Sequence, residues 1–381
     1  MRRRAPLVLA AALAAALSLV LSGSASAAPA EPVVVASGLD NPRQLAWGSN
    51  GALLVAEAGR GKVNPGPNGC FTGPEGETCL GVTGSISRIA DPARTVDGDA
   101  RRVVTGLISG ASREGGSAVG SNGVSFQNGK ILVAMTWAPP DVLPRTGVPK
   151  WQLGKLIRAT PWPSHAKKSI ADLAAIEVTQ NPDGTDVNAN PYAVLALDDH
   201  RSVVADAGGN HLVLVDRGKA RVLTVMPAHG CGGVVTPECD MHSVPTSLAK
   251  GPGHALYVGE LAHFEPGGAR VVKVSPTTGK VLGFYGKGGT LCAKDTAGFS
   301  GISGIAFGPD GSLYVSELFG GATGGQVVRI SPTCQRTAVP VPMPAGLLTD
   351  SKGSVFVSAF SISDRDGADG APPGQIWKLR F

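Results

Sequence analysis

Short apolar segments separated by glycine-rich polar turns recur along this chain. The clearest copy runs from Gly308 to Glu317, where a Pro-Asp-Gly turn leads into an apolar strand that ends in a carboxylate. A unit of this kind that returns about six times, at spacings of roughly 40–80 residues, predicts a repeat architecture rather than a single irregular core. The weaker copies begin at Gly48, Gln127, Asp198, Gly251 and Asp350.

Each repeat divides into four short strands. In the fifth repeat, Ile302 to Phe307 is the first strand, and Pro309-Asp310-Gly311 is a hairpin turn in which glycine supplies the positive φ. The other three strands are Leu313 to Glu317, Gln326 to Ile330 and Thr337 to Val341. Four-stranded sheets repeated around an axis are the blades of a β-propeller. The pattern therefore predicts an all-β, six-bladed β-propeller of four-stranded blades.

Two repeats depart from the regular pattern. In the second, the fourth strand is predicted at Ala175 to Val178, although Lys168 to Val178 is the only helix-like stretch beyond the N-terminal segment. The sixth repeat offers three strands before the chain stops. We expect Pro32 to Ala36 to supply the missing outer strand of the C-terminal blade and to close the ring, which protects strand edges. An open array with frayed ends is the alternative.

Residues 1–27 have the features of a secretory signal peptide. Three arginines, Arg2 to Arg4, precede the apolar run Ala5 to Leu21, and Ala25-Ser26-Ala27 is a small-residue cleavage site. A retained anchor is the alternative, but the apolar run is shorter than the ~20 residues of a typical spanning helix. We therefore expect a secreted, extracellular protein whose residues 28–381 form one propeller domain without a membrane span.

Removal of the signal peptide changes the charge of the protein. The formal net charge of the whole chain is +5, and the loss of three arginines leaves +2. The remaining chain has no run of lysine and arginine, whereas nucleic-acid binding requires a basic stripe. We therefore do not expect a nucleic acid as partner.

Six cysteines in an exported chain predict disulfide bonds rather than free thiols. Fifteen pairings are possible in principle, and sequence proximity favours two local bridges, leaving the third by elimination. His229 and His242 flank one of the local pairs, so a zinc site of two cysteines and two histidines is the alternative there. The pairs are Cys70–Cys79, Cys231–Cys239 and Cys292–Cys334.

Several phrases of the sequence also carry a family resemblance. Asn190 to Val194 followed by Val204 to Asn210, and the segments Gly259 to Arg270 and Ile305 to Val315, resemble the ScyD/ScyE family of exported bacterial propellers. The likeness runs over essentially the whole mature chain, and it implies a six-bladed propeller and export but no reaction. The phrase Pro-Asp-Gly-x-Leu-Tyr-Val is shared with NHL-type, SMP-30/gluconolactonase-like and quinone-dependent sugar dehydrogenase propellers, so it indicates a blade hairpin and not one function.

Propeller geometry predicts where a ligand would bind. Residues just before the first strand and just after the second strand of each blade share one mouth of the central channel. Carboxylate and amide oxygens are the ligands that Ca²⁺ or Mg²⁺ prefers, although asparagine also favours turns and the acids can be solvated or paired with arginine. The predicted ligand-binding residues are Asn41, Asn122 and Asn190 before first strands, and Glu57, Asp206, Glu260 and Glu317 after second strands. Of these, the predicted metal ligands are Glu57, Asn190, Asp206 and Glu260.

The function predicted from these features is binding of an unidentified small molecule or extracellular protein at the channel mouth. A metal-dependent hydrolase of the SMP-30/gluconolactonase type and a structural platform for protein interactions are the alternatives. The chain has no Gly-x-Ser-x-Gly nucleophile elbow and no Gly-x-Gly-x-x-Gly stretch between a strand and a helix. The long, proline-rich second repeat contains Trp137, Trp151 and Trp162, which offer aromatic surfaces for recognition or for packing on the blade.

Overall fold

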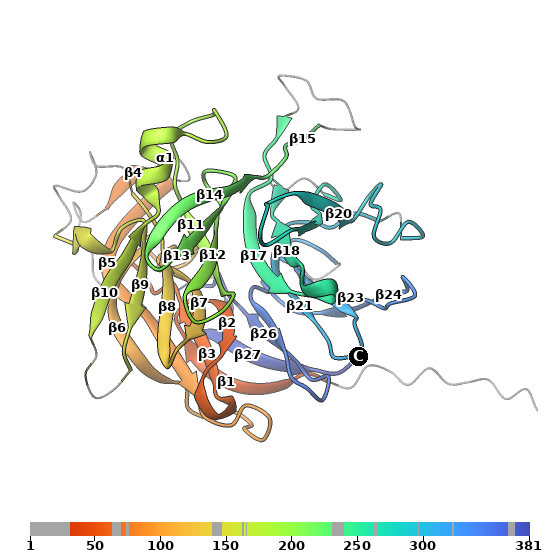
Figure 1. Cartoon of the computed structure of the whole chain (residues 1–381). Coiled ribbons are helices and arrows are strands. Elements are labelled where there is room, and N and C mark those ends of the chain that lie inside the picture. The colour runs from red at the N-terminus through yellow and green to blue at the C-terminus, as the bar shows by residue number, and fades with distance from the viewer. Residues whose placement is uncertain are drawn as a thin grey trace, which may run out of the picture.

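Six antiparallel sheets surround a central axis in the computed structural model (Figure 1). The structure describes residues 31–381 except 63–69, 74–75, 139–146, 162–163, 165, 231–239, 263–265, 296, 322–323 and 365–369. Each sheet provides four strands of a blade, so the prediction of an all-β, six-bladed β-propeller is confirmed. A two-stranded hairpin, β15 (His229–Gly230) and β16 (Asp240–Met241), stands apart from the blades.

The first three blades follow the chain from the inner strand to the outer strand. Blade 1 contains β2 (Pro42–Trp47), β3 (Leu53–Glu57), β5 (Gly76–Ile89) and β6 (Arg101–Ala111), and the short β4 (Phe71–Gly73) also pairs with β5. Blade 2 contains β7 (Ser121–Gln127), β8 (Lys130–Met135), β9 (Lys155–Ala159) and β10 (Lys167–Asp172). Blade 3 contains β11 (Pro191–Ala196), β12 (Arg201–Asp206), β13 (His211–Asp216) and β14 (Lys219–Val225).

The next two blades repeat this order, and the last takes one strand from the other end of the chain. Blade 4 contains β17 (Pro245–Lys250), β18 (Leu256–Glu260), β19 (Val271–Val274) and β20 (Val281–Tyr285). Blade 5 contains β21 (Ile302–Phe307), β22 (Leu313–Glu317), β23 (Gln326–Ile330) and β24 (Arg336–Pro340). Blade 6 contains β25 (Leu347–Thr349), β26 (Val355–Ala359), β27 (Gly374–Leu379) and, at its outer edge, β1 (Val33–Leu39).

The N-terminal strand lies against the C-terminal strand. β1 pairs antiparallel with β27, with Val34 opposite Trp377 and Leu39 opposite Gly374, and in Figure 1 the red and blue ends of the chain meet in one blade. The pairing segment is the one that the sequence singled out as a β-rich run without a partner. That this pairing holds the ring closed stays a prediction.

The hydrophobic core lies between the blades. In β8, Ile131 and Val133 pack toward blade 1, whereas Leu132 and Ala134 pack toward blade 3. Side chains alternate between the two faces of a strand, so a strand that is covered on both faces is apolar at almost every position. The same alternation holds in the second strands β3, β12, β18, β22 and β26, which explains why these segments are continuous apolar runs.

The outer part of blade 2 differs from the sequence prediction. The strand predicted at Ala175 to Val178 is wrong, because the fourth strand is β10 and the following residues form the helix α1 (Ala174–Gln180). Asp172 Oδ1 accepts a hydrogen bond from the N–H of Ala175 at 3.1 Å, which holds the start of the helix. Leu173 and Ile176 are buried at a spacing of three residues, and this spacing suits one face of a helix.

Two disulfide bonds lie in the described part of the chain. Cys70 bonds with Cys79, and Cys292 bonds with Cys334 across 42 residues, as predicted. The predicted bridge Cys231–Cys239 lies outside the described residues, and so does the zinc alternative that uses the same pair. Among the described residues, none of the helices has the length and hydropathy required to cross a bilayer.

Candidate functional site

The pairing of first and second strands brings the predicted residues to one end of the ring. Asn41 and Asn190 immediately precede β2 and β11, and Asn122 is the second residue of β7. We call this end of the propeller the rim. The four predicted acids terminate second strands, opposite the first residue of the paired first strand: Glu57 opposite Pro42, Asp206 opposite Pro191, Glu260 opposite Pro245 and Glu317 opposite Ile302.

Irregular pairing marks the rim end of the first strands. Five of the six first strands carry one extra residue next to their rim end, the exception being β25. A bulge of this kind bends the strand and re-aims side chains, and bulges are frequent beside active sites. Asn122 is the extra residue in β7, and Thr246 and Ser303 are the extra residues in β17 and β21.

The side chains at these bulges cross the axis of the ring. Gln44 of blade 1 donates hydrogen bonds of 2.9 Å to the carbonyl oxygens of Thr246 in blade 4 and Ser303 in blade 5. Ser303 Oγ in turn donates to the carbonyl oxygen of Pro344 at 2.7 Å. At the level of Gln44 the centre of the propeller is therefore bridged by a side chain.

Three of the four predicted acids share one structural contact. Each accepts a hydrogen bond from a backbone N–H just before the first strand of its own blade. This contact joins the end of the second strand to the start of the first, so the recurrent acid is a feature of the blade itself. The pairs are Asp40 N to Glu57 Oε2 at 2.7 Å, Asn190 N to Asp206 Oδ1 at 2.7 Å and Ser300 N to Glu317 Oε1 at 2.8 Å.

The carboxylates of Glu57 and Glu260 are engaged further by arginine. Arg102 contacts both oxygens of the fully buried Glu57, at 2.8 and 3.2 Å, and Ser85 and Ser87 also donate to Oε1. Arg270 contacts the fully buried Glu260 at 3.0 Å. The sequence left such arginine pairing open as an alternative to metal binding. These contacts do not fit a metal site that Glu57 and Glu260 share with rim residues of other blades.

The oxygens of the predicted metal ligands are also dispersed. In the described ranges, Cys70, Glu77 and Cys79 form the only group of three histidine, cysteine or acidic side chains whose ligand atoms lie within 4.8 Å of one another. Two of these residues are joined in a disulfide bond. The prediction of a Ca²⁺ or Mg²⁺ site therefore finds no preformed set of three carboxylates in this part of the chain.

The three predicted asparagines divide into two roles. Asn41 adopts a positive φ of 49° and donates from Nδ2 to the carbonyl oxygens of Gly59 and Gly115 at 3.0 Å, which is turn chemistry. Asn122 and Asn190 instead meet across the boundary of blades 2 and 3. Asn122 Nδ2 lies 3.4 Å from Asn190 Oδ1, which also accepts a hydrogen bond from Thr136 Oγ1 at 3.1 Å.

Asp206 completes this contact group and has an oxygen without a partner. Its Oδ1 accepts from the backbone N–H groups of Asn190, Gly208 and Gly209 at 2.7, 3.2 and 3.1 Å. Its Oδ2 is fully buried and has no hydrogen-bond partner among the described residues. Burial raises the pKa of Asp206, against the opposing effect of His211 and of these N–H groups. We call Asn122, Thr136, Asn190 and Asp206 the rim cluster.

Two buried ionisable residues that the sequence did not single out lie beside the rim cluster. His211 Nδ1 donates to the carbonyl oxygen of Gly209 at 2.7 Å, so the ring proton is on that nitrogen, and Glu177 Oε2 lies 3.7 Å from it. Both side chains are fully buried. Among the described residues, neither oxygen of Glu177 nor Nε2 of His211 has a well-formed hydrogen bond. A Cβ on Gly209 would lie 2.5 Å from Glu177 Oε2, so this pair also requires glycine there.

The environment of Glu177 shifts its protonation. Burial raises the pKa of Glu177 to about 7, and the charges of Asp183, Asp206 and Asp186 act in the same direction, whereas the backbone N–H of Asn188 opposes it. A carboxyl group with this pKa exchanges a proton near neutral pH, and perturbed groups of this kind concentrate at functional sites. One signal in the sequence points to it, since Glu177 is the only charged residue within the apolar stretch of α1. In Figure 1, α1 and β15 both lie along the upper edge of the molecule.

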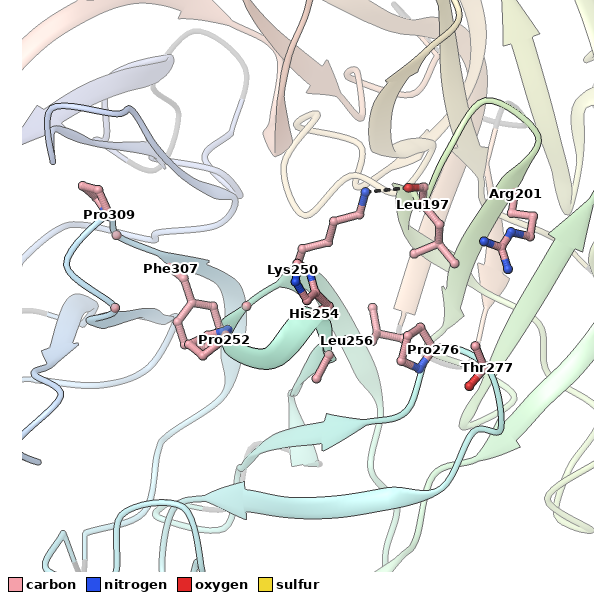
Figure 2. A pocket seen from close by; sticks show the side chains of 14 residues that line it. Leu197, Arg201, Lys250, Pro252, His254, Leu256, Pro276, Thr277, Phe307 and Pro309 are labelled. Carbon is pink, nitrogen blue, oxygen red and sulfur yellow. Dashed lines mark hydrogen bonds between the residues drawn. The ribbon is translucent and has the colours of Figure 1, made fainter.

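The opposite end of the propeller carries a groove that the sequence did not predict (Figure 2). It has a volume of about 610 Å³ and is lined by turns of blades 3, 4 and 5. Leu197, Pro276 and Phe307 are among its apolar residues, and Arg201 and Lys250 among its basic ones. Its turns connect first to second strands in blades 3, 4 and 5 and the third to the fourth strand in blade 4, so the groove and the rim cluster lie at opposite ends of the blades.

Comparison with known proteins supports no assignment of function. No protein-family model and no curated protein matches the chain, so membership of the ScyD/ScyE family stays a resemblance. Similar solved structures include a streptogramin B lyase (14% identity, 92% of this chain and 96% of that chain, TM-score 0.46) and virginiamycin B lyase from Staphylococcus aureus (13%, 92% and 98%, 0.45). A protein provisionally named a gluconolactonase is similar at 11% identity over 93% of this chain and 92% of that chain, with a TM-score of 0.47. At these identities and scores, nothing about activity follows.

Proposed function

We propose that this chain is an exported propeller that binds a small molecule at the rim cluster of blades 2 and 3. The observation that carries the proposal is the contact of Asn122 at the bulge of β7, Asn190 just before β11 and Asp206 at the end of β12, which joins blades 2 and 3. The second carboxylate oxygen of Asp206, Oδ2, is buried without a partner among the described residues. A buried acceptor left unpaired costs about 1–3 kcal/mol, so a molecule that donates a hydrogen bond there gains binding energy.

The chemistry of the rim cluster indicates the class of ligand. Asp206 Oδ2 has no partner among the described residues, and neither has His211 Nε2, which is an acceptor because the ring proton is on Nδ1. A complementary ligand therefore presents donors, as hydroxyl or amino groups do. Asn190 is the partly exposed member of the cluster, so a ligand reaches the site along this side chain. A polyhydroxylated or amino compound is the class we propose.

Two features of the chain support export of the protein. The segment 1–27 has the charge and apolar pattern of a signal peptide, and the two disulfide bonds are compatible with an oxidising compartment. An extracellular binding protein is consistent with both features. A platform for protein interactions is the alternative that an absence of small-molecule binding would favour.

A metal-dependent hydrolase remains the second hypothesis, and it has a separate test. The unpartnered Asp206 Oδ2 beside Asn190 is the observation that favours it, whereas the arginine contacts of Glu57 and Glu260 disfavour the predicted four-residue ligand set. Elemental analysis of purified protein should find stoichiometric Ca²⁺, Mg²⁺ or Zn²⁺ if a metal is resident. Absence of metal, with no rise in melting temperature on its addition, would remove this hypothesis.

The binding proposal is tested by a thermal-shift screen of sugars, polyols, amines and amino acids. We expect at least one compound to raise the melting temperature of the wild-type protein, and Asp206→Asn to weaken its binding at least about tenfold, because the amide replaces an acceptor by a donor. Glu317→Gln is the matched control, since Glu317 ends the second strand of blade 5 but does not belong to the rim cluster. Equal losses in both variants, or no compound that binds, would contradict the proposal.

A further inference from the structure

Hydrogen bonds between neighbouring blades form a belt at the groove end of the propeller. They come from the last residue of the first strand in each blade concerned. Trp47 donates to the carbonyl oxygen of Thr349 at 3.0 Å, and Thr349 Oγ1 donates to that of Phe307 at 2.6 Å. Gln127 and Lys250 donate likewise to the carbonyl oxygens of Arg201 and Leu197, at 3.1 and 2.7 Å.

Blades 3 and 5 depart from this belt. β11 ends at Ala196 and is followed by Leu197, and β21 ends at Phe307, so neither first strand offers a polar side chain at this place. The Phe307 ring packs on the Tyr257 ring with centroids 4.5 Å apart. A Cβ on Gly251 would lie 2.6 Å from Phe307, which requires glycine in the adjoining turn. The repeat is thus broken by apolar residues on both sides of blade 4.

The groove lies over the turns of blade 4, beside the apolar residues Leu197 and Phe307 that follow or end the first strands of blades 3 and 5. Leu197 and Phe307 belong to its lining, together with Pro252, Leu256 and Pro276 from blade 4. Figure 2 shows Lys250 extending over the groove to the carbonyl oxygen of Leu197. Its volume of about 610 Å³ lies within the range of roughly 300–1,000 Å³ that is usual for small-molecule sites.

The charged side chains among the lining residues of the groove are basic. They are Arg201 and Lys250, whereas Asp198, which pairs with Arg201, lies outside the lining. Arg201 Nε is held by Asp198 at 2.7 Å, which leaves its two terminal amino groups for another acceptor. The ammonium group of Lys250 has three donors, and the contact with Leu197 uses one of them. An apolar floor beneath donors of positive charge is complementary to an anion with an apolar body.

We propose that this groove is a second binding site, for a small anion in which a carboxylate or sulfonate is attached to an aromatic or alicyclic body. The body packs against Leu197, Pro276 and Phe307, and the anionic group accepts hydrogen bonds from Lys250 and Arg201. This site is independent of the rim cluster, because it lies at the other end of the blades and shares no residue with it.

The test uses the fluorescent anion 8-anilinonaphthalene-1-sulfonate with the whole protein. We expect saturable binding of one equivalent, and much weaker binding of the uncharged N-phenyl-1-naphthylamine. Lys250→Met keeps the length of the side chain but removes its charge and should weaken dye binding about fivefold to tenfold, because charge-assisted hydrogen bonds are the strong ones. Lys250→Arg should retain binding, which separates loss of charge from loss of folding.

Lys352→Met is the matched control for charge. Lys352 is exposed and lies in the corresponding turn between the first and second strands of blade 6, so its loss should change the affinity less than about twofold. A third variant, Phe307→Thr, introduces the residue that blade 6 has at this place, Thr349. It should weaken dye binding, because it removes the Phe307 ring from the lining of the groove. Equal affinities of Lys250→Met and Lys352→Met, or equal binding of the charged and uncharged dyes, would overturn the proposal. Loss of dye binding in Asn190→Ala would place the dye at the rim cluster and would overturn it as well.

Discussion

At the scale of residues, the acid that ends a second strand holds its blade together, and in blade 3 it also belongs to the rim cluster. The acid that ends a second strand accepts the N–H before the first strand in blades 1, 3 and 5, so its recurrence follows from the fold. Glu57 also forms an ion pair with Arg102. Asp206 instead keeps one carboxylate oxygen without a partner among the described residues. The sequence shows that an acid recurs at this position. It does not show in which blades both oxygens of that acid have hydrogen-bond partners.

The first prediction concerns Glu57. Glu57→Gln should destabilise the propeller by about 1–3 kcal/mol, because the fully buried carboxylate accepts hydrogen bonds from Arg102, Ser85 and Ser87 and an amide cannot replace them all. Glu77→Gln is the control, since Glu77 also pairs with an arginine but both partners are exposed, and such pairs contribute about 1 kcal/mol or less. Urea denaturation monitored by circular dichroism measures both variants. Similar midpoints for the two variants would argue against a structural role for Glu57.

The second prediction concerns Glu177 and pH. The pKa of this carboxyl is raised by burial from 4.5 to about 7 in the folded protein. Between these values the folded state keeps a proton that the unfolded chain has lost, so stability falls as pH rises from 4.5 to 7. Glu177→Gln cannot ionise. The melting temperature of the variant minus that of the wild type should therefore increase from pH 5 to pH 7.5.

To test whether Glu177 loses its proton in this range, the melting temperatures of the wild type and of Glu177→Gln are measured from pH 5 to pH 7.5. Taking the difference between them removes the pH effects that the two proteins share and leaves the effect of the Glu177 carboxyl group. A difference that stays constant from pH 5 to pH 7.5 would mean that Glu177 does not titrate there.

At the scale of elements, the sequence predicts most strands but not every contact between them. Turn chemistry and short apolar runs place the strands of the five blades other than blade 2 correctly. Between Lys167 and Gln180 the apolar pattern does not distinguish a strand from a helix, because a short apolar segment is compatible with both. The residues Glu177 and His211 are joined only by folding, through α1 and β13. The groove also escapes prediction, since it depends on how turns of three blades meet.

The third prediction tests the strand that joins the two ends of the chain. Deletion of Pro32 to Ala36 should lower the melting temperature of the whole domain, because the edge of β27 loses its partner and Val35, which is fully buried, is removed. Ser37→Ala is the control, since this residue of β1 is exposed. An unchanged melting curve after the deletion would show that the ring does not depend on this strand for closure.

At the scale of the whole molecule, Gln44 links blades that are distant in sequence. Its amide donates to blades 4 and 5 from blade 1, so it couples opposite sides of the ring through the axis. The two candidate binding sites lie at opposite ends of the blades that this bridge connects. One end presents unpaired acceptors and the other presents basic donors over an apolar floor, which suits two chemically different ligands.

The fourth prediction concerns this central bridge. Gln44→Ala should destabilise the propeller by about 1–3 kcal/mol, because two buried carbonyl oxygens lose their donor. Differential scanning calorimetry should show a single transition at lower temperature if the blades unfold together. Gln335→Ala is the control, since Gln335 lies in a turn at the outside of blade 5. Equal melting temperatures for the two variants would mean that the bridge contributes nothing.

The central claim is that a small molecule binds at the rim cluster, and a crystal structure of the protein with a compound from the thermal-shift screen tests it most directly. Our account predicts density for the compound in contact with Asn190 and within hydrogen-bond distance of Asp206 Oδ2. Density for the compound elsewhere, with a water molecule or an ion alone as the partner of Asp206 Oδ2, would contradict it.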